Sequence, residues 1–145
     1  MQTTNLVGAI TANAYMLLII AVFALRIAGQ ADVARWIGLA STIVVLPLAY
    51  LLVVALHAGR PPIYFIWLGL MILFAVFELI VDQILRVDIR SAQRSVILYV
   101  VFFFGATGGM IGVASQAGRP WGALTGIVFL IMAALAFISR ALTGI

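Results

Sequence analysis

Four charged residues at four-residue spacing form the stretch of this sequence most capable of chemistry. Glu78, Asp82, Arg86 and Arg90 follow one another at the end of the apolar run 63–85. At 100° per residue, the first three share one face of a helix, and an acid four residues before a base favours an ion pair. Ionisable side chains inside a membrane helix are functional candidates, because burying their charge in hydrocarbon is costly. We therefore predict that Glu78, Asp82 and Arg86 bind an ion or a ligand.

A structural role for this charged cluster is the competing interpretation. Asp82 can pair with Arg86, which would make the cluster a salt-bridged helix end. Glu78 can pair with Arg86 or with an arginine of another connector, namely Arg26, Arg35 or Arg94. Glu78 lies deepest, roughly 12 Å further along the helix axis than Arg86. It is therefore the member that most requires a functional explanation.

Asn13 is a polar residue inside the first apolar run, and it has two interpretations. A buried asparagine in a membrane helix usually hydrogen-bonds to a neighbouring helix, at about 0.6–2 kcal/mol. The alternative is direct contact with a ligand, so Asn13 is kept as a candidate binding residue. His57, the single histidine, closes an apolar run and is interpreted as a residue of the membrane interface.

The residue types that are missing exclude several kinds of chemistry. The chain contains no cysteine, no lysine and one histidine. It therefore has no disulfide or thiolate metal site, no Schiff base and no bis-histidine haem site. Glu78 and Asp82 alone lack the metal ligands or acid–base partners that catalysis needs. We predict a non-enzymatic protein with no cofactor and no metal.

The composition indicates that the solvent of this chain is lipid. Hydrophobic residues make up 66% of the 145 residues and charged residues 8%, against about 25% charged residues in a soluble domain. The mean hydropathy is +1.30 and the net charge +4. All eight cations are arginines scattered at the ends of apolar runs. That distribution is typical of headgroup anchoring and argues against a nucleic-acid partner.

Five apolar runs predict the fold. Each approaches the roughly 20 residues that cross a bilayer as a helix. We predict an all-α polytopic integral membrane protein, a five-helix bundle forming one transmembrane domain over residues 1–145. The expected helices cover approximately 6–25, 36–56, 63–85, 95–115 and 121–138. Pro47 should kink the second helix and free a carbonyl, for which Ser41, Thr42 or Tyr50 would supply a hydroxyl donor.

The distribution of arginine predicts the orientation. With the N-terminus outside, six arginines lie on the cytoplasmic side and two, Arg60 and Arg119, on the other. Cytoplasmic segments are enriched in arginine, so we predict N-out and C-in. The first residues lack the basic region of a cleavable signal, and we expect the first run to be kept. The expected location is the cytoplasmic (inner) membrane of a prokaryote.

A short sequence recurs in the two predicted outer connectors. Ala58-Gly59-Arg60-Pro61 returns as Ala117-Gly118-Arg119-Pro120, an offset of 59 residues. The same offset aligns further apolar residues in the flanking runs. This pattern predicts an internal repeat in which helices 2 and 3 correspond to helices 4 and 5. Parallel repeats of this kind occur in transporters and in compact bundles.

Glycines at four-residue spacing predict close helix packing. They form the pairs Gly105 and Gly109, Gly108 and Gly112, and Gly122 and Gly126. Such spacing lets another backbone approach closely. The partner helix can belong to the same chain or to another one.

Three functions fit these patterns. The first is transport of an ion or solute through Glu78 and Asp82. The second is binding of a lipid-like ligand within the bundle, with Trp67, Met71 and Phe74 on the walls. The alternative is an assembly subunit that packs through its glycines against a second copy or another membrane protein. Membrane lipid is the expected partner in every case.

Overall fold

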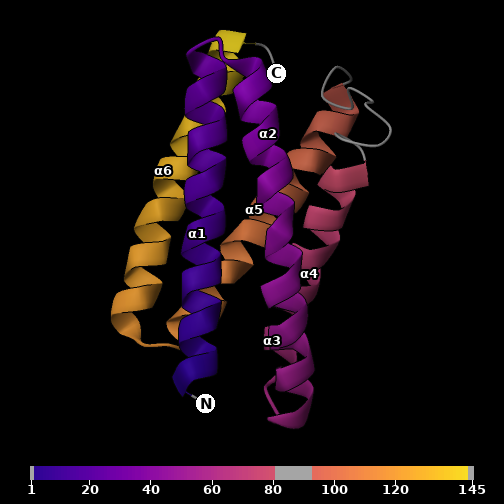
Figure 1. Ribbon diagram of the computed structural model, residues 1–145, viewed down its shortest axis with the longest axis vertical. Coiled ribbons are helices and arrows are strands. Elements are labelled where there is room, and N and C mark those ends of the chain that lie inside the picture. The colour runs from indigo at the N-terminus through magenta and orange to yellow at the C-terminus, as the bar shows by residue number, and fades with distance from the viewer. Residues whose placement is uncertain (1, 81–92, 144–145) are drawn as a thin grey trace.

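The computed structural model describes residues 2–80 and 93–143, and within these ranges the secondary structure is helical. Figure 1 shows the helices side by side along one long axis. Their bounds are Gln2–Ile27 (α1), Ala31–Ser41 (α2), Thr42–Val44 (the 3₁₀ segment η1), Val45–His57 (α3), Pro62–Glu78 (α4), Gln93–Ser115 (α5) and Arg119–Thr143 (α6). The predicted all-α class is confirmed for the described residues.

Four helical segments are long and apolar enough to cross a membrane. They are α1, the continuous segment Ala31–His57, α5 from Val96, and α6 to Leu142. The fifth apolar helix, α4, is shorter at 17 residues. The protein is therefore an integral membrane helical bundle, as the composition predicted.

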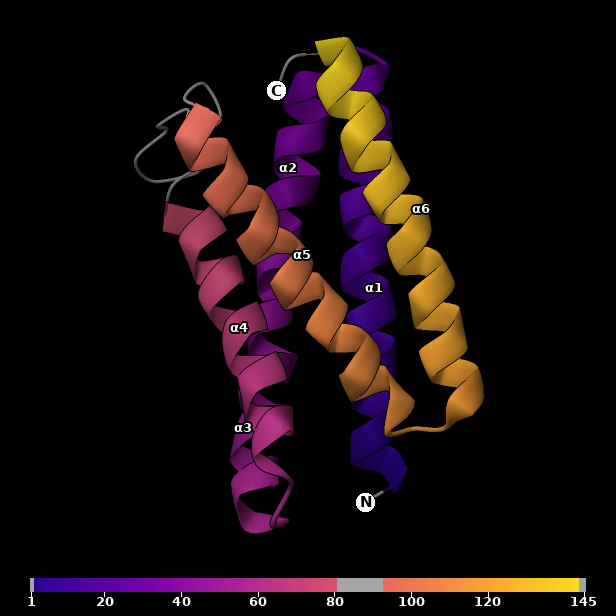
Figure 2. The same ribbon diagram turned by 180° about the vertical axis from the view of Figure 1, so that it is seen from behind.

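The helical segments α1, Ala31–His57, α4, α5 and α6 alternate in direction, and the two ends of the chain lie at opposite ends of the bundle (Figures 1 and 2). The turns α3–α4 and α5–α6 lie at the end that holds the N-terminus. The α1–α2 connector lies at the other end, with the C-terminus. Helix α1 packs against α2, α3, α5 and α6 and so forms the centre of the bundle.

Helix α5 is oblique to the other helices, and this tilt shapes the molecule. Figure 2 shows α5 starting beside α4 and ending beside the start of α6. At the end of α5, a β-carbon at Gly122 would collide with the Ser115 side chain, so only glycine allows this approach. In the second half of α5, a β-carbon at Gly112 would lie 2.5 Å from the Trp67 ring and one at Gly109 would lie 3.0 Å away. The Trp67 ring of α4 therefore packs against Gly109 and Gly112 of α5.

The remaining predicted packing glycines have looser surroundings. A β-carbon at Gly108 would make ordinary contact with Phe129 at 3.8 Å, and one at Gly105 or Gly126 would meet nothing within 4 Å. The partner of the tight glycine surface thus lies in the same chain.

The helices extend further than the apolar runs. Helix α1 begins at Gln2, α2 begins at Ala31 and α6 continues to Thr143, each several residues beyond the predicted bound. The physical reason is that helical hydrogen bonding continues past the hydrocarbon into the headgroup region. Helix α1 ends where Gly29 takes a φ of 75°, which favours glycine. The predicted end of the third helix at residue 85 falls outside the described residues.

Pro47 has a different local effect from the one predicted. In an α-helix its missing N–H would have paired with the carbonyl of Ile43, and the chain there tightens into η1. Ser41 and Thr42 donate instead to the carbonyls of Gly38 and Leu39, at 2.6 and 2.7 Å. Their short hydroxyls reach back one turn and not forward to Ile43, and Tyr50 is exposed. Ser41 and Thr42 are therefore not the substitute donors, whereas Tyr50 stays a prediction.

A hydrogen-bonded cluster joins three segments at the N-terminal end. Arg60 donates to Oδ1 of Asn5 and, at 3.4 Å, to Oε1 of Gln116, and Asn5 donates to the Gln116 carbonyl at 2.7 Å. The Arg60 guanidinium also lies 5.2 Å from the centre of the Tyr64 ring. This Arg60 cluster ties the start of α1 to both outer turns.

Candidate functional site

Glu78, at the end of α4, is held by tyrosines from two other helices. The hydroxyl of Tyr99 on α5 donates to Oε1 at 2.6 Å, and the hydroxyl of Tyr15 on α1 donates to Oε2 at 3.4 Å. Tyr15 is buried and Glu78 is half-buried. Each oxygen thus receives its own phenol donor, which is the arrangement that an ionised carboxylate accepts.

The position of Glu78 along the bundle follows from its hydrogen bond to Tyr15. Its partner Tyr15 is 12 residues before Ile27, the end of α1, which is roughly 18 Å along the axis. The carboxylate therefore contacts the central helix near its middle. The interior of a membrane protein is where an acidic side chain is most costly and most often functional.

The other predicted members of the charged cluster fall outside the described residues. These are Asp82, Arg86 and Arg90, together with the Arg94 side chain. Sequence reasoning missed Tyr15 and Tyr99 as partners of Glu78. The available signal was that a tyrosine inside an apolar run needs a hydrogen-bond partner for its hydroxyl.

Asn13 forms an interhelical hydrogen bond. Its Nδ2 donates to Oγ1 of Thr125 on α6 at 2.8 Å and to the Ala9 carbonyl at 2.8 Å. The Oδ1 atom has no hydrogen-bond partner among the described residues. Asn13 thus links α1 to α6, away from Glu78, which hydrogen-bonds to α1 and α5.

A cleft opens between α5 and α6, with α1 behind it, at the end of the bundle that holds the C-terminus. Its volume is about 560 Å³ when the open mouth is included. It follows from the tilt of α5, which touches α6 at one end and diverges from it toward the other (Figure 2). The lining residues are Phe23, Arg26, Val96, Tyr99, Val100, Phe103, Phe104, Ala136, Phe137 and Arg140.

The walls of this cleft are aromatic and aliphatic. Phe104 stacks on Phe137 across the α5–α6 gap with 5.8 Å between ring centres. Phe23 meets Phe103 edge to face at 6.2 Å. Phe137 is 61% exposed, so this wall continues onto the outer surface of the bundle.

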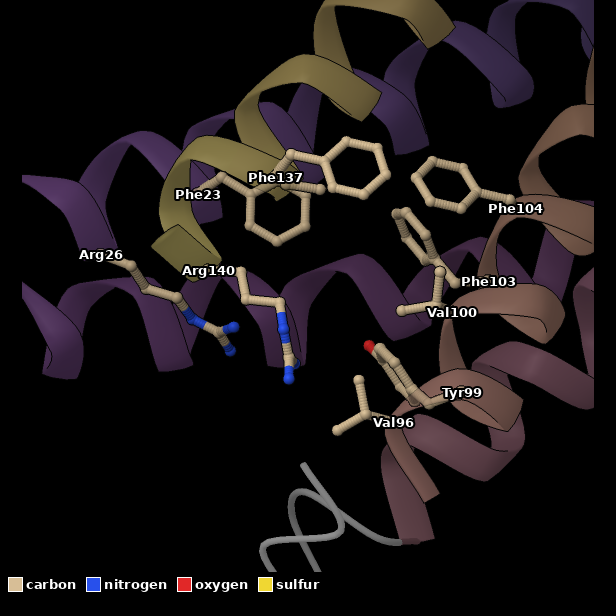
Figure 3. A pocket seen from close by; sticks show the side chains of 10 residues that line it. Phe23, Arg26, Val96, Tyr99, Val100, Phe103, Phe104, Phe137 and Arg140 are labelled. Atoms are coloured by element: carbon tan, nitrogen blue, oxygen red, sulfur yellow. The ribbon is translucent and has the colours of Figure 1, made fainter. Parts of the chain in front are cut away.

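Two arginines stand at the mouth of the cleft. Arg26 and Arg140 lie in the last turns of α1 and α6. Figure 3 shows both side chains extending in the same direction, away from the rings of Phe23 and Phe137. The cleft is therefore amphipathic, with apolar walls and a cationic mouth. Tyr99 lines it as well, which places the hydrogen-bonded Glu78 directly behind one wall.

The walls predicted from the sequence differ from those of this cleft. Met71 and Phe74 are fully buried in the core, and Trp67 is seated on Gly109 and Gly112. Among residues 2–80 and 93–143, no group of three or more His, Cys, Asp or Glu side chains is placed to hold a metal ion.

Comparison with protein families, with curated proteins and with solved structures finds no match for this chain.

Proposed function

We propose that this integral membrane protein binds a lipid-like ligand in the cleft between α1, α5 and α6. The observation that carries the proposal is the combination of phenylalanine walls with an open side toward lipid. The cleft is open along one side and lined mainly by apolar side chains, so an acyl chain can lie along it without being enclosed. The role is binding without chemical conversion.

Filling the cleft tests this proposal. Ala136 lines it, whereas Ala134 lies on the same helix, is exposed and does not line it. We expect Ala136→Phe to remove most of the lipid that co-purifies with the protein, because the new ring occupies the space of the chain. Ala134→Phe should leave it unchanged. Native mass spectrometry of both variants in nonionic detergent measures this, and equal lipid retention would refute the proposal.

We further propose the N-out, C-in orientation in the inner membrane of a prokaryote. Arg26, Arg35 and Arg140 belong to the end of the bundle that holds the C-terminus, and Arg60 and Arg119 to the other end. This asymmetry supports a cytoplasmic C-terminus. A C-terminal phosphatase fusion that is active in the periplasm would contradict it.

An internal duplication is also proposed, pairing the segment from α2 to α4 with α5 and α6. Both recurring connectors lie at the same end of the bundle, and Gly59 and Gly118 both take positive φ, at 61° and 134°. A structural superposition of the two halves that fails to overlay the paired helices would remove this proposal.

Ion or solute transport is the second candidate, and the depth of Glu78 favours it. A carboxylate near the middle of the central helix, held by two hydroxyls, is suited to bind a proton or a cation. Proteoliposome flux is the test, and a flux that is unchanged in Glu78→Gln would remove this candidate.

A further inference from the structure

We infer that the ligand of the cleft is an anionic lipid, whose phosphate or carboxylate group sits between Arg26 and Arg140 while an acyl chain follows the phenylalanine wall. The inference rests on the proposed function, and it adds the chemical class of the ligand.

Charge complementarity is the first argument. Two of the ten lining residues are cationic and none of the ten is acidic, while the carboxylate of Glu78 is already engaged by the hydroxyls of Tyr99 and Tyr15. The choline or ethanolamine of a zwitterionic lipid would therefore find no counter-charge among them, whereas a headgroup with net negative charge would. A guanidinium carries five N–H donors in a planar fork that fits phosphate and carboxylate. One guanidinium can thus donate hydrogen bonds to a ligand and to neighbouring protein groups at the same time.

The position of the arginines is the second argument. They come from two helices, and Figure 3 shows their side chains extending together from one edge of the cleft. A group bound by both would bridge the ends of α1 and α6. Arg35 belongs to the same end of the bundle, yet it does not line the cleft. It is therefore a matched control of identical type.

Depth is the third argument. The wall on α5 runs from Val96 to Phe104, which is roughly 12 Å along the helix. One leaflet contributes about half of the ~30 Å hydrocarbon core. The cleft thus matches the depth of one leaflet, with the arginines at the headgroup level. A membrane lipid can occupy it without leaving its own leaflet.

The test compares headgroups at constant chain composition. Purified full-length protein in nonionic detergent is titrated with dioleoyl phosphatidylglycerol, dioleoyl phosphatidylcholine, dioleoylglycerol and inorganic phosphate, with binding measured by native mass spectrometry. We expect phosphatidylglycerol to bind about tenfold more tightly than phosphatidylcholine, because the choline cation offsets the phosphate charge near the two arginines, and tenfold corresponds to about 1.4 kcal/mol.

Substitution of the arginines should remove this preference. In Arg26→Gln/Arg140→Gln, phosphatidylglycerol and phosphatidylcholine should bind within about twofold of each other, because only the chain contacts remain, and Arg140→Gln alone should already reduce the preference. Arg35→Gln should keep the full preference. Arg140 is exposed, so its substitution alone separates a lost headgroup contact from a fold disturbed at Arg26, and thermal unfolding of each variant verifies this.

The outcomes separate the two proposals. If all three lipids bind equally and Ala136→Phe blocks that binding, the inference that the ligand is anionic is wrong. The proposal that the cleft binds a lipid is then kept. If no lipid binds, or if Ala136→Phe does not reduce the binding, the proposed function itself is wrong. If millimolar inorganic phosphate displaces all of the bound phosphatidylglycerol, the cleft is a site for a free anion. A lipid is then not the source of the anion.

Discussion

Glu78 is positioned by two hydroxyl groups that belong to distant parts of the chain. Tyr15 and Tyr99 are 63 and 21 residues away in sequence, and they belong to two different helices, α1 and α5. Tyr99 has a second role, because its ring lines the cleft. A single residue therefore contacts both the acidic group and the space proposed for the ligand.

Removing the Tyr99 hydroxyl should destabilise the bundle. We expect Tyr99→Phe to lower the free energy of unfolding by about 1–3 kcal/mol, since a hydrogen bond to a charged group is lost. Tyr50→Phe is the control because Tyr50 is 55% exposed, and it should change the value by less than about 0.5 kcal/mol. Unfolding in mixed detergent micelles provides the measurement.

A double-mutant cycle with Glu78→Met attributes the effect to this pair. The coupling energy between positions 78 and 99 should exceed about 0.5 kcal/mol. Strictly additive effects would show that the hydroxyl stabilises the protein through something other than Glu78.

Part of this site is predictable at the residue scale. Glu78 stands out because an acid deep in an apolar run is costly. Its partners do not stand out, since tyrosines in apolar runs are equally expected at the headgroup level. Only the arrangement of α1, α4 and α5 brings the three side chains together.

At the scale of elements, the contact between Trp67 and the glycines of α5 determines how that helix lies. The ring needs the space that a β-carbon at Gly112 would fill. Gly105, one turn earlier than Gly109, has no such neighbour. Gly105 and Gly109 belong to one sequence pattern, yet only Gly109 lies in close contact with another helix.

Gly112→Ala should be destabilising where Gly105→Ala is not. Overpacking against the indole should cost about 1–3 kcal/mol. The second substitution should be neutral or stabilising by up to about 1 kcal/mol, because alanine favours the helix. Unfolding of the two variants under identical conditions measures the difference.

Adding Trp67→Phe to Gly112→Ala should recover part of the loss, since the smaller ring makes room. A Gly112→Ala variant as stable as Gly105→Ala would show that α5 does not depend on this contact.

The sequence predicts that the helices exist, but it does not predict how they tilt against one another. Apolar runs of membrane-crossing length predict each helix because lipid leaves the backbone few alternatives. The tilt of α5 depends on which glycines face Trp67 and Ser115. Since the cleft arises from that tilt, Arg26 and Arg140 could be predicted as headgroup anchors but not as two sides of one mouth.

At the scale of the whole molecule, the two recurring connectors differ in what their arginines contact. Arg60 joins Asn5, Gln116 and the face of Tyr64. Arg119, its counterpart in the repeat, is exposed. Sequence identity between the connectors therefore hides an asymmetry that the packing of α1 introduces, because α1 has no counterpart in the repeat.

We expect Arg60→Gln to lower the free energy of unfolding by about 1–2 kcal/mol, through lost hydrogen bonds and the lost cation–π contact. The matched Arg119→Gln should change it by less than about 0.5 kcal/mol. Thermal unfolding in detergent measures both. Equal losses would mean that the two connectors contribute alike.

The close contact of Gly122 with Ser115 lies far from Arg140 on the same helix. Gly122 and Arg140 are 18 residues apart on one helix, or roughly 27 Å. A rotation of one degree about the contact therefore moves Arg140 by about 0.5 Å. A change at Gly122 that tilts α6 would therefore alter the spacing between the Arg26 and Arg140 side chains at the opposite end of the molecule.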